Sequence, residues 1–149
     1  MFITILGISI ILFSKNYSQS DFSRIRLPEN IEIKTPSPDL PKEIAAFSGK
    51  WKGSWQNQMD FILVIMEIDR DKAEVIYAFA DAPAWGIRNS SYDYYSAKVV
   101  SNKKPRIEFT GRGLSSWFTF EMETDLKTLK GTYEPRSAPN RKAVLVKID

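Results

Sequence analysis

The sequence predicts an all-β fold, an antiparallel up-and-down eight-stranded barrel with a short N-terminal helix. Apolar and polar residues alternate in short runs from residue 49 to the end of the chain, which is the period of half-buried strands. Turn-forming residues separate most consecutive runs by only a few positions, as in β-hairpins. Residues 47–55, Phe-Ser-Gly-Lys-Trp-Lys-Gly-Ser-Trp, place an indole where it can plug one end of a small barrel, next to a glycine that lets the chain bend tightly.

The expected strands follow one another along the chain. They lie at 50–55, 60–68, 73–79, 92–100, 107–109, 118–122, 129–133 and 143–148. The second strand is apolar at every position from 61 to 66, so both of its faces should be covered. Closing the series into a barrel would remove exposed strand edges. A half-open sheet wrapped on the N-terminal helix is the competing geometry.

The segment before the first strand divides into a leader and a helix. Residues 21–41 contain four prolines and little apolar periodicity, which predicts an extended leader. Part of this leader is expected to lie along the barrel through its aliphatic side chains, Ile25, Leu27, Ile31 and Ile33. Residues 42–47 follow a proline, begin with an acidic first turn and continue with alanines, so they predict the short helix. Residues 42–149 then form one barrel domain.

Residues 1–20 predict a signal peptide and therefore export to the periplasm or the exterior. An apolar run of about a dozen residues, within the usual span of a signal-peptide core, extends from Phe2 to Phe13 and is too short to cross a bilayer as a helix. Small residues at Ser18 and Ser20 fit cleavage before Asp21, after which no membrane span would remain. No Lys or Arg precedes the run, and the alternative is a buried first strand.

Composition and charge exclude several classes of function. The 21 Lys and Arg are interleaved with 18 Asp and Glu, so the sequence offers no basic stripe for nucleic acid. Cysteine and histidine are both absent, which excludes disulfides, thiol nucleophiles and zinc sites of the Cys/His type. The acidic residues show no calcium-loop spacing. We therefore predict neither a metal nor a cofactor, and an enzyme is the less expected outcome.

The Gly-x-Trp triplet Gly49-Lys50-Trp51, the helical lead-in and the eight-strand count resemble the lipocalin-like, or calycin, barrels. In those families a cation from the last strand often packs over this indole, and Lys147 or Arg141 is placed to do so. The resemblance assigns structural roles to Gly49, Trp51 and Lys147. It also implies a barrel that binds a small apolar or amphipathic molecule.

The expected ligand site combines the barrel interior with one long loop. Residues 80–91 connect two strands that could be joined by a shorter turn, and long loops in compact domains are often functional. In this hypothesis the pocket is lined by Phe79, Phe109, Phe120, Met122 and Tyr133. The rim and its lid carry Asp81, Trp85, Arg88, Tyr92 and Tyr94. Alternatively, the loop is structural, with Trp85 capping the barrel and Asp81 capping the following turn.

Two other functions remain open from the sequence. The barrel is short and rich in aromatic residues, so these can fill it entirely; it would then act as a binding module for a glycan or a protein. Surface aromatics would carry that function, including Trp117, Trp85 and the group Tyr92, Tyr94 and Tyr95. An enzyme using Asp81 with Tyr92 or Arg88 is the third hypothesis.

Overall fold

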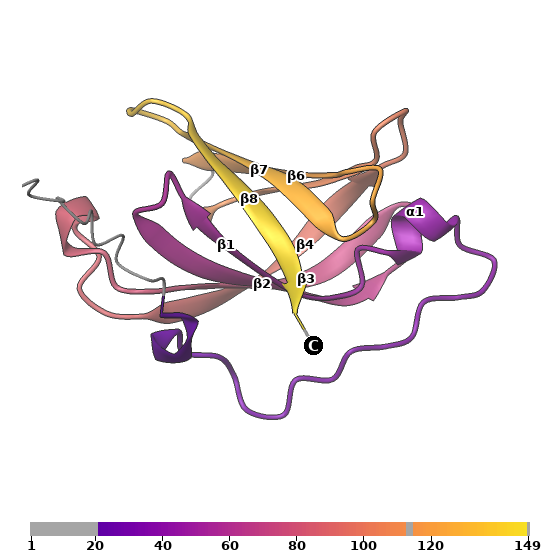
Figure 1. Ribbon diagram of the computed structural model, residues 1–149, viewed down its shortest axis with the longest axis horizontal. Coiled ribbons are helices and arrows are strands. Elements are labelled where there is room, and N and C mark those ends of the chain that lie inside the picture. The colour runs from indigo at the N-terminus through magenta and orange to yellow at the C-terminus, as the bar shows by residue number, and fades with distance from the viewer. Residues whose placement is uncertain (1–20, 113–114, 149) are drawn as a thin grey trace, which may run out of the picture.

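The computed structural model describes residues 21–112 and 115–148 and shows a closed barrel of antiparallel strands (Figure 1). The strands are β1 (Gly49–Trp55), β2 (Met59–Ile68), β3 (Lys72–Phe79), β4 (Ser91–Val100), β5 (Arg106–Thr110), β6 (Ser116–Met122), β7 (Thr128–Pro135) and β8 (Arg141–Ile148). Three short helical segments accompany them, η1 (Phe22–Arg24), α1 (Lys42–Ala45) and η2 (Pro83–Trp85). The predicted all-β barrel, its strand order and the short helix before it are confirmed.

Each strand pairs with its neighbours in the chain, and β1 also pairs with β8. The closing ladder joins Lys50 to Ile148, Trp51 to Lys147 and Lys52 to Val146. This ladder decides between the two geometries that the sequence left open, because a half-open sheet would leave these edges unpaired. A β-bulge in β2, between Ile65 and Glu67, adds local twist to the wall.

Aromatic rings fill the barrel interior. Trp55 stacks on Phe61 with ring centroids 4.6 Å apart. Phe118 lies between Phe109 and Tyr133, at centroid distances of 5.0 and 4.7 Å. These rings come from inward positions of β1, β2, β5, β6 and β7. Because alternate residues of a strand point to the same face, the rings of all five strands meet in the barrel interior. The middle of the barrel is a packed core.

The end of the barrel beside α1 is closed by Trp51. The indole N–H of Trp51 donates a hydrogen bond to the carbonyl oxygen of Phe47 at 2.8 Å. The Lys147 ammonium lies 5.1 Å from the Trp51 ring centroid and donates to the carbonyl oxygen of Ala46 at 2.8 Å. Gly49 has a φ of +115°, and a Cβ there would lie 3.1 Å from Lys147 Cε, so the turn into β1 requires glycine. The floor therefore joins the helix end, the first strand and the last strand.

The leader packs along the outside of the barrel. Ile25 is buried against the outward side chains of β2 and β3, among them Ile62, Val64 and Ile76. The backbone N–H of Lys34 donates to the carbonyl oxygen of Met66 at 2.8 Å. These contacts explain why β2 is apolar on both faces, since one face meets the core and the other meets the leader. The further members of this outer cluster are Phe22, Leu27, Ile31, Met66, Ala78, Ala80 and Tyr92.

The leader thus has a larger part in the fold than an extended linker, although Ile33 stays 37% exposed. In Figure 1 it runs as a long indigo and purple strand-free segment beneath the barrel before it reaches α1. The predicted signal peptide, residues 1–20, lies outside the described residues. Within residues 21–112 and 115–148, no helix is long and apolar enough to cross a membrane.

Candidate ligand site at the barrel mouth

A cavity of about 270 Å³ opens at the barrel end opposite α1. We call this end the mouth. It is formed where β2 and β8 begin and where β3 and β7 end, together with the loop between β3 and β4. The lining residues are Met59, Tyr77, Phe79, Trp85, Ile87, Phe118, Tyr133, Pro135 and Arg141. The cavity is therefore mostly apolar, with phenol groups and one guanidinium, which is the usual composition of a small-molecule site.

The loop over the mouth is an ordered turn. Ala82 and Ile87 form a two-way backbone bridge, and the 3₁₀ turn Pro83–Trp85 lies between them. Gly86 ends the turn with a φ of +75°, a conformation that favours glycine. This hairpin-like turn places the Trp85 ring in the cavity lining, and we call the loop with its Trp85 ring the lid.

Two side chains hold the Trp85 ring. Its indole N–H donates to Gln58 Oε1 at 3.1 Å. The guanidinium carbon of Arg141 lies 3.4 Å from the ring centroid, which is within the range of a cation–π contact. Since Gln58 belongs to the β1–β2 turn and Arg141 begins β8, the lid is fixed to two separate parts of the rim.

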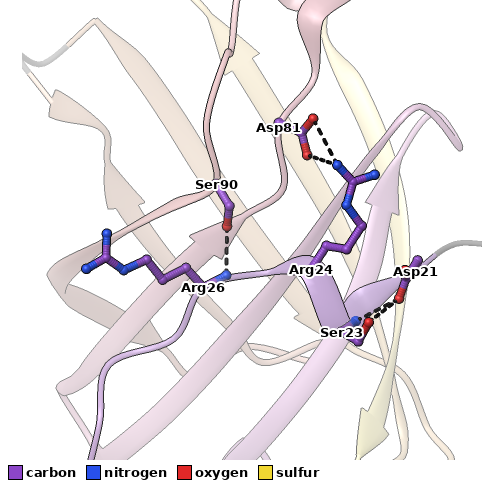
Figure 2. A network of polar contacts seen from close by, with 6 residues as sticks. All are labelled: Asp21, Ser23, Arg24, Arg26, Asp81 and Ser90. Atoms are coloured by element: carbon purple, nitrogen blue, oxygen red, sulfur yellow. Dashed lines mark hydrogen bonds and ion pairs between the residues drawn. The ribbon is translucent and has the colours of Figure 1, made fainter.

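The leader fastens the base of the same loop (Figure 2). The Arg24 guanidinium lies 3.4 Å from a carboxylate oxygen of Asp81, where the loop begins. The backbone N–H of Arg26 donates to Ser90 Oγ at 2.7 Å, where the loop ends. Asp81 thus contacts the leader. The alternative drawn from the sequence, in which the loop is structural, expects Asp81 to cap the following turn. The loop and the leader are expected to become ordered together.

Burial raises the pKa of two phenols in this part of the barrel, Tyr77 in the cavity lining and Tyr95 outside it. The Tyr77 hydroxyl accepts a hydrogen bond from the Trp55 indole N–H at 2.8 Å, and burial raises the pKa of Tyr77. Burial, with Asp93 nearby, raises the pKa of Tyr95 to about 12. The Tyr77 hydroxyl can take part in a hydrogen bond with a neutral hydroxyl in the cavity, and neither phenol supplies a phenolate near pH 7.

The structure brings three of the predicted site residues together at the mouth. Phe79 and Tyr133 line the cavity, and Trp85 covers it. Phe109, Phe120 and Met122 lie deeper, in the packed core, and they do not line this cavity.

The remaining predicted rim residues lie away from the cavity. Arg88 is exposed and Asp81 is engaged with Arg24. Tyr92 packs against the leader cluster, and Tyr94 is 59% exposed, with the two rings edge to face at 6.0 Å. Their places follow from strand alternation, because positions 92 and 94 of β4 point outward while position 95 points inward.

Arg141 is a residue of the cavity lining that the sequence places differently. The resemblance offers Lys147 or Arg141 for the contact over Trp51; Lys147 makes that contact, and Arg141 lies at the other end of the same strand. The signal was present in the sequence, since residues 141 and 147 are six positions apart on one strand and point to the same side. Distinguishing the two required knowing which end of β8 meets the Gly-x-Trp floor.

The surface aromatics do not form one continuous group. Trp117 is 42% exposed on β6. Tyr95 points into the barrel, where its ring stacks on Phe109 at 4.7 Å, so it does not belong to an outer platform. Among the described residues, no group of three acidic side chains is arranged to hold a metal ion.

Comparison with known proteins assigns no family to this chain. No family model matches the sequence, and no curated protein matches it at a significant level. The lipocalin-like interpretation accordingly rests on the closed eight-stranded barrel and on the residues at its floor.

Proposed function

We propose that the protein binds a small, planar, negatively charged molecule at the barrel mouth. The observation that carries this proposal is the cavity of about 270 Å³ beneath Trp85, in which Arg141 is the one charged side chain of the lining. Such a molecule is an amphipathic ligand, with an apolar ring toward the core and a carboxylate toward the rim. The lid, the aromatic walls and the guanidinium each recognise one part of it.

The size of the cavity limits the ligand to about one or two rings. An apolar cavity of roughly 150 Å³ is enough to hold benzene, and the mouth offers about 270 Å³. Below the cavity, Phe118 stacks against Phe109 and closes the way to the interior. A long acyl chain would have to displace these rings, so a short rigid molecule fits better.

The charge of the ligand follows from Arg141. None of the described Asp or Glu side chains lies within 4.0 Å of its guanidinium as an ion-pair partner. The flat face of the Arg141 guanidinium packs on the Trp85 ring. The N–H groups at the edge of the guanidinium can therefore donate hydrogen bonds to a ligand. Guanidinium edges suit carboxylates, because two parallel hydrogen bonds form at once.

The experiment compares benzoate with benzyl alcohol by isothermal titration calorimetry. We expect benzoate to bind more tightly, and Arg141→Met to weaken benzoate by about tenfold or more, since a charged hydrogen bond contributes about 1.5–3 kcal/mol. Arg88→Met is the matched control, because Arg88 is an exposed arginine of the lid loop outside the cavity. Equal affinities for the two compounds, or equal losses in both variants, would contradict the proposal.

Export is part of the same proposal. The apolar run of residues 2–13 and the small residues before Asp21 support it. The test is the mass of the protein recovered from its native host. A chain beginning at Asp21 is expected, and a chain that retains residues 1–20 in the cytoplasm would rule export out.

A second candidate function is glycan or protein binding through the outer aromatics. The exposure of Trp117 favours it, because an indole that is 42% exposed on a strand can stack on a sugar ring. Oligosaccharide binding that is lost in Trp117→Ala and kept in Arg141→Met would favour this function over the mouth site.

A further inference from the structure

A second concavity, of about 770 Å³, lies on the outer surface of the barrel. We call it the outer groove. It crosses the outward side chains of β1, β8, β7 and β6, and Phe22 of the leader stands at its rim. None of the residues that line the mouth cavity belongs to it, so the two sites are separate.

The groove has a structural cause in three small residues that point inward behind it, Gly53, Gly131 and Ala143. A Cβ at Gly53 would lie 2.8 Å from Leu145 Cγ, and one at Gly131 would lie 3.1 Å from Trp55 Cη2. The wall therefore rests directly on the large aromatic rings of the core. Because the wall sinks inward at these positions, its outer surface is hollowed.

The floor of the groove is apolar. Val144 is 61% exposed and Val146 is 43% exposed, both on the outward face of β8. Outward positions of a barrel strand are normally polar when nothing covers them. Phe22 extends the same apolar surface from the leader. Together these side chains offer a strip that follows β8.

Cations border this strip. The Lys52 ammonium lies 5.4 Å from the Phe22 ring centroid, and Lys142 Nζ donates to Thr132 Oγ1 at 2.9 Å. Within the part of the chain that the structure describes, neither lysine has a carboxylate within 4.0 Å. Lys130, by contrast, lies 3.5 Å from Glu123.

One acidic side chain lines the groove, Glu121, and it lies 3.6 Å from Lys104. The lining therefore carries three lysines against a single carboxylate that already has a partner.

Ser54 supplies an unused hydroxyl at the same place. Its Oγ is buried and has no hydrogen-bond partner among the described residues. Ser54 lies two residues from Lys52 on the same face of β1, and the backbone N–H of Gln56 pairs with the carbonyl oxygen of Lys142. A carboxylate outside the lining, that of Asp60, belongs to the residue directly across from Ser54 in the β1–β2 ladder.

We propose that the outer groove binds a single-chain amphiphile with an anionic head group. The acyl chain lies along Val144 and Val146, and the head group is held near Lys142 and Ser54. Two lysines without acidic partners match the charge of the head, and the exposed valines match the chain. This site does not depend on the mouth proposal.

The test uses two-dimensional ¹H–¹⁵N NMR of the protein titrated with dodecanoate below its micelle concentration. We expect shifts of the backbone amide signals of Val144 and Val146, and a much weaker response to dodecyltrimethylammonium, which has the opposite charge. The Trp85 indole signal reports the mouth in the same spectra. An absence of shifts at β8, shifts at Trp85 alone, or equal binding of both detergents would overturn the proposal.

Single substitutions test how much each charged side chain contributes to dodecanoate binding. Lys142→Gln is expected to weaken dodecanoate by up to about fivefold, the range of an exposed ion pair. Lys98→Gln is the matched control, since Lys98 is an exposed lysine on β4 outside the groove, and it should leave the affinity unchanged. Asp60→Asn should tighten binding, because it removes the negative charge directly across the β1–β2 ladder from Ser54. Equal effects of Lys142→Gln and Lys98→Gln would contradict the assignment.

The same head-group chemistry occurs in free amphiphiles and in anionic bilayers. Sedimentation with phosphatidylglycerol vesicles distinguishes the two sources. Binding of dodecanoate without vesicle binding is expected for a free amphiphile, whereas vesicle binding that Lys142→Gln reduces would show that the groove meets a bilayer surface and would overturn the assignment to a free ligand. Vesicle binding that ignores Lys142 would count against the groove.

Discussion

Replacing Tyr77 by phenylalanine tests the packed centre of the barrel. Tyr77 is 5% exposed and Trp55 is fully buried, and the Trp55 indole N–H donates to the Tyr77 hydroxyl at 2.8 Å. Tyr77→Phe keeps the ring, whose centroid lies 4.9 Å from that of Phe118 in a tilted arrangement, and removes the acceptor. The Trp55 N–H is then left without a partner in an apolar core.

The expected cost is about 1–3 kcal/mol of unfolding free energy, which is the penalty of an unsatisfied buried donor. With a urea m-value of about 2 kcal/mol per M for a domain of this size, the midpoint should fall by about 0.5–1.5 M. Urea unfolding followed by tryptophan fluorescence measures this directly. Tyr95→Phe is the control, because its half-buried hydroxyl makes only a 3.4 Å contact with Asp93.

The pH dependence gives the same variant a second readout. Burial raises the folded-state pKa of Tyr77 above its ordinary value of 10.0. The stabilisation that comes from the neutral phenol is therefore complete below pH 10 and is lost as the pH rises beyond it. Tyr77→Phe should lose less stability above pH 10 than the unsubstituted protein. A variant that unfolds at the same urea concentration as the unsubstituted protein, with the same alkaline profile, would refute this reasoning.

Three other predictions test the wall, the leader and a turn. Ile25→Ala should cost about 2 kcal/mol or more in urea unfolding, because it opens a cavity under the leader, and an unchanged midpoint would mean that the leader does not stabilise the barrel. Gly131→Ala should cost about 1–3 kcal/mol through contact with Trp55; a gain in stability would show that the wall can move outward. Backbone N–H groups of Lys127 and Thr128, with the Thr128 hydroxyl, lower the pKa of Asp125, so stability from its charged form is present above about pH 4 and lost below it. Asp125→Asn should flatten the acid limb of the stability profile, and an unaltered limb would contradict the assignment.

The strand series could be predicted because alternation is a local signal. Inward residues such as Ile107 on β5, Phe120 on β6 and Leu129 on β7 are fixed by the alternation in their own strands. The contact between Trp51 and the last strand followed from the resemblance. Coverage of both faces of β2 could be expected from its apolar run, but the identity of the covering segment depended on how the leader crosses the barrel.

The sites were harder to predict because they depend on packing between distant strands. Alternation gave Phe79, Phe109 and Tyr133 the same inward direction, yet only the depth of each residue decides whether it meets a ring or a cavity. Arg141 lines the mouth cavity because it is the first residue of β8, at the end of the strand far from Trp51. The outer groove arises from Gly53 and Gly131, whose effect appears only when the opposing rings are in place.

The most direct test of the mouth site is the indole N–H spectrum of the protein during a titration with benzoate. The four tryptophans of the chain report four places: Trp51 the floor, Trp55 the packed centre, Trp85 the mouth and Trp117 the outer wall. We predict that the Trp85 signal shifts in a saturable way while those of Trp51 and Trp117 stay fixed. A spectrum in which Trp85 does not respond, or in which Trp51 or Trp117 responds most, would contradict a filled barrel that binds its ligand at the mouth.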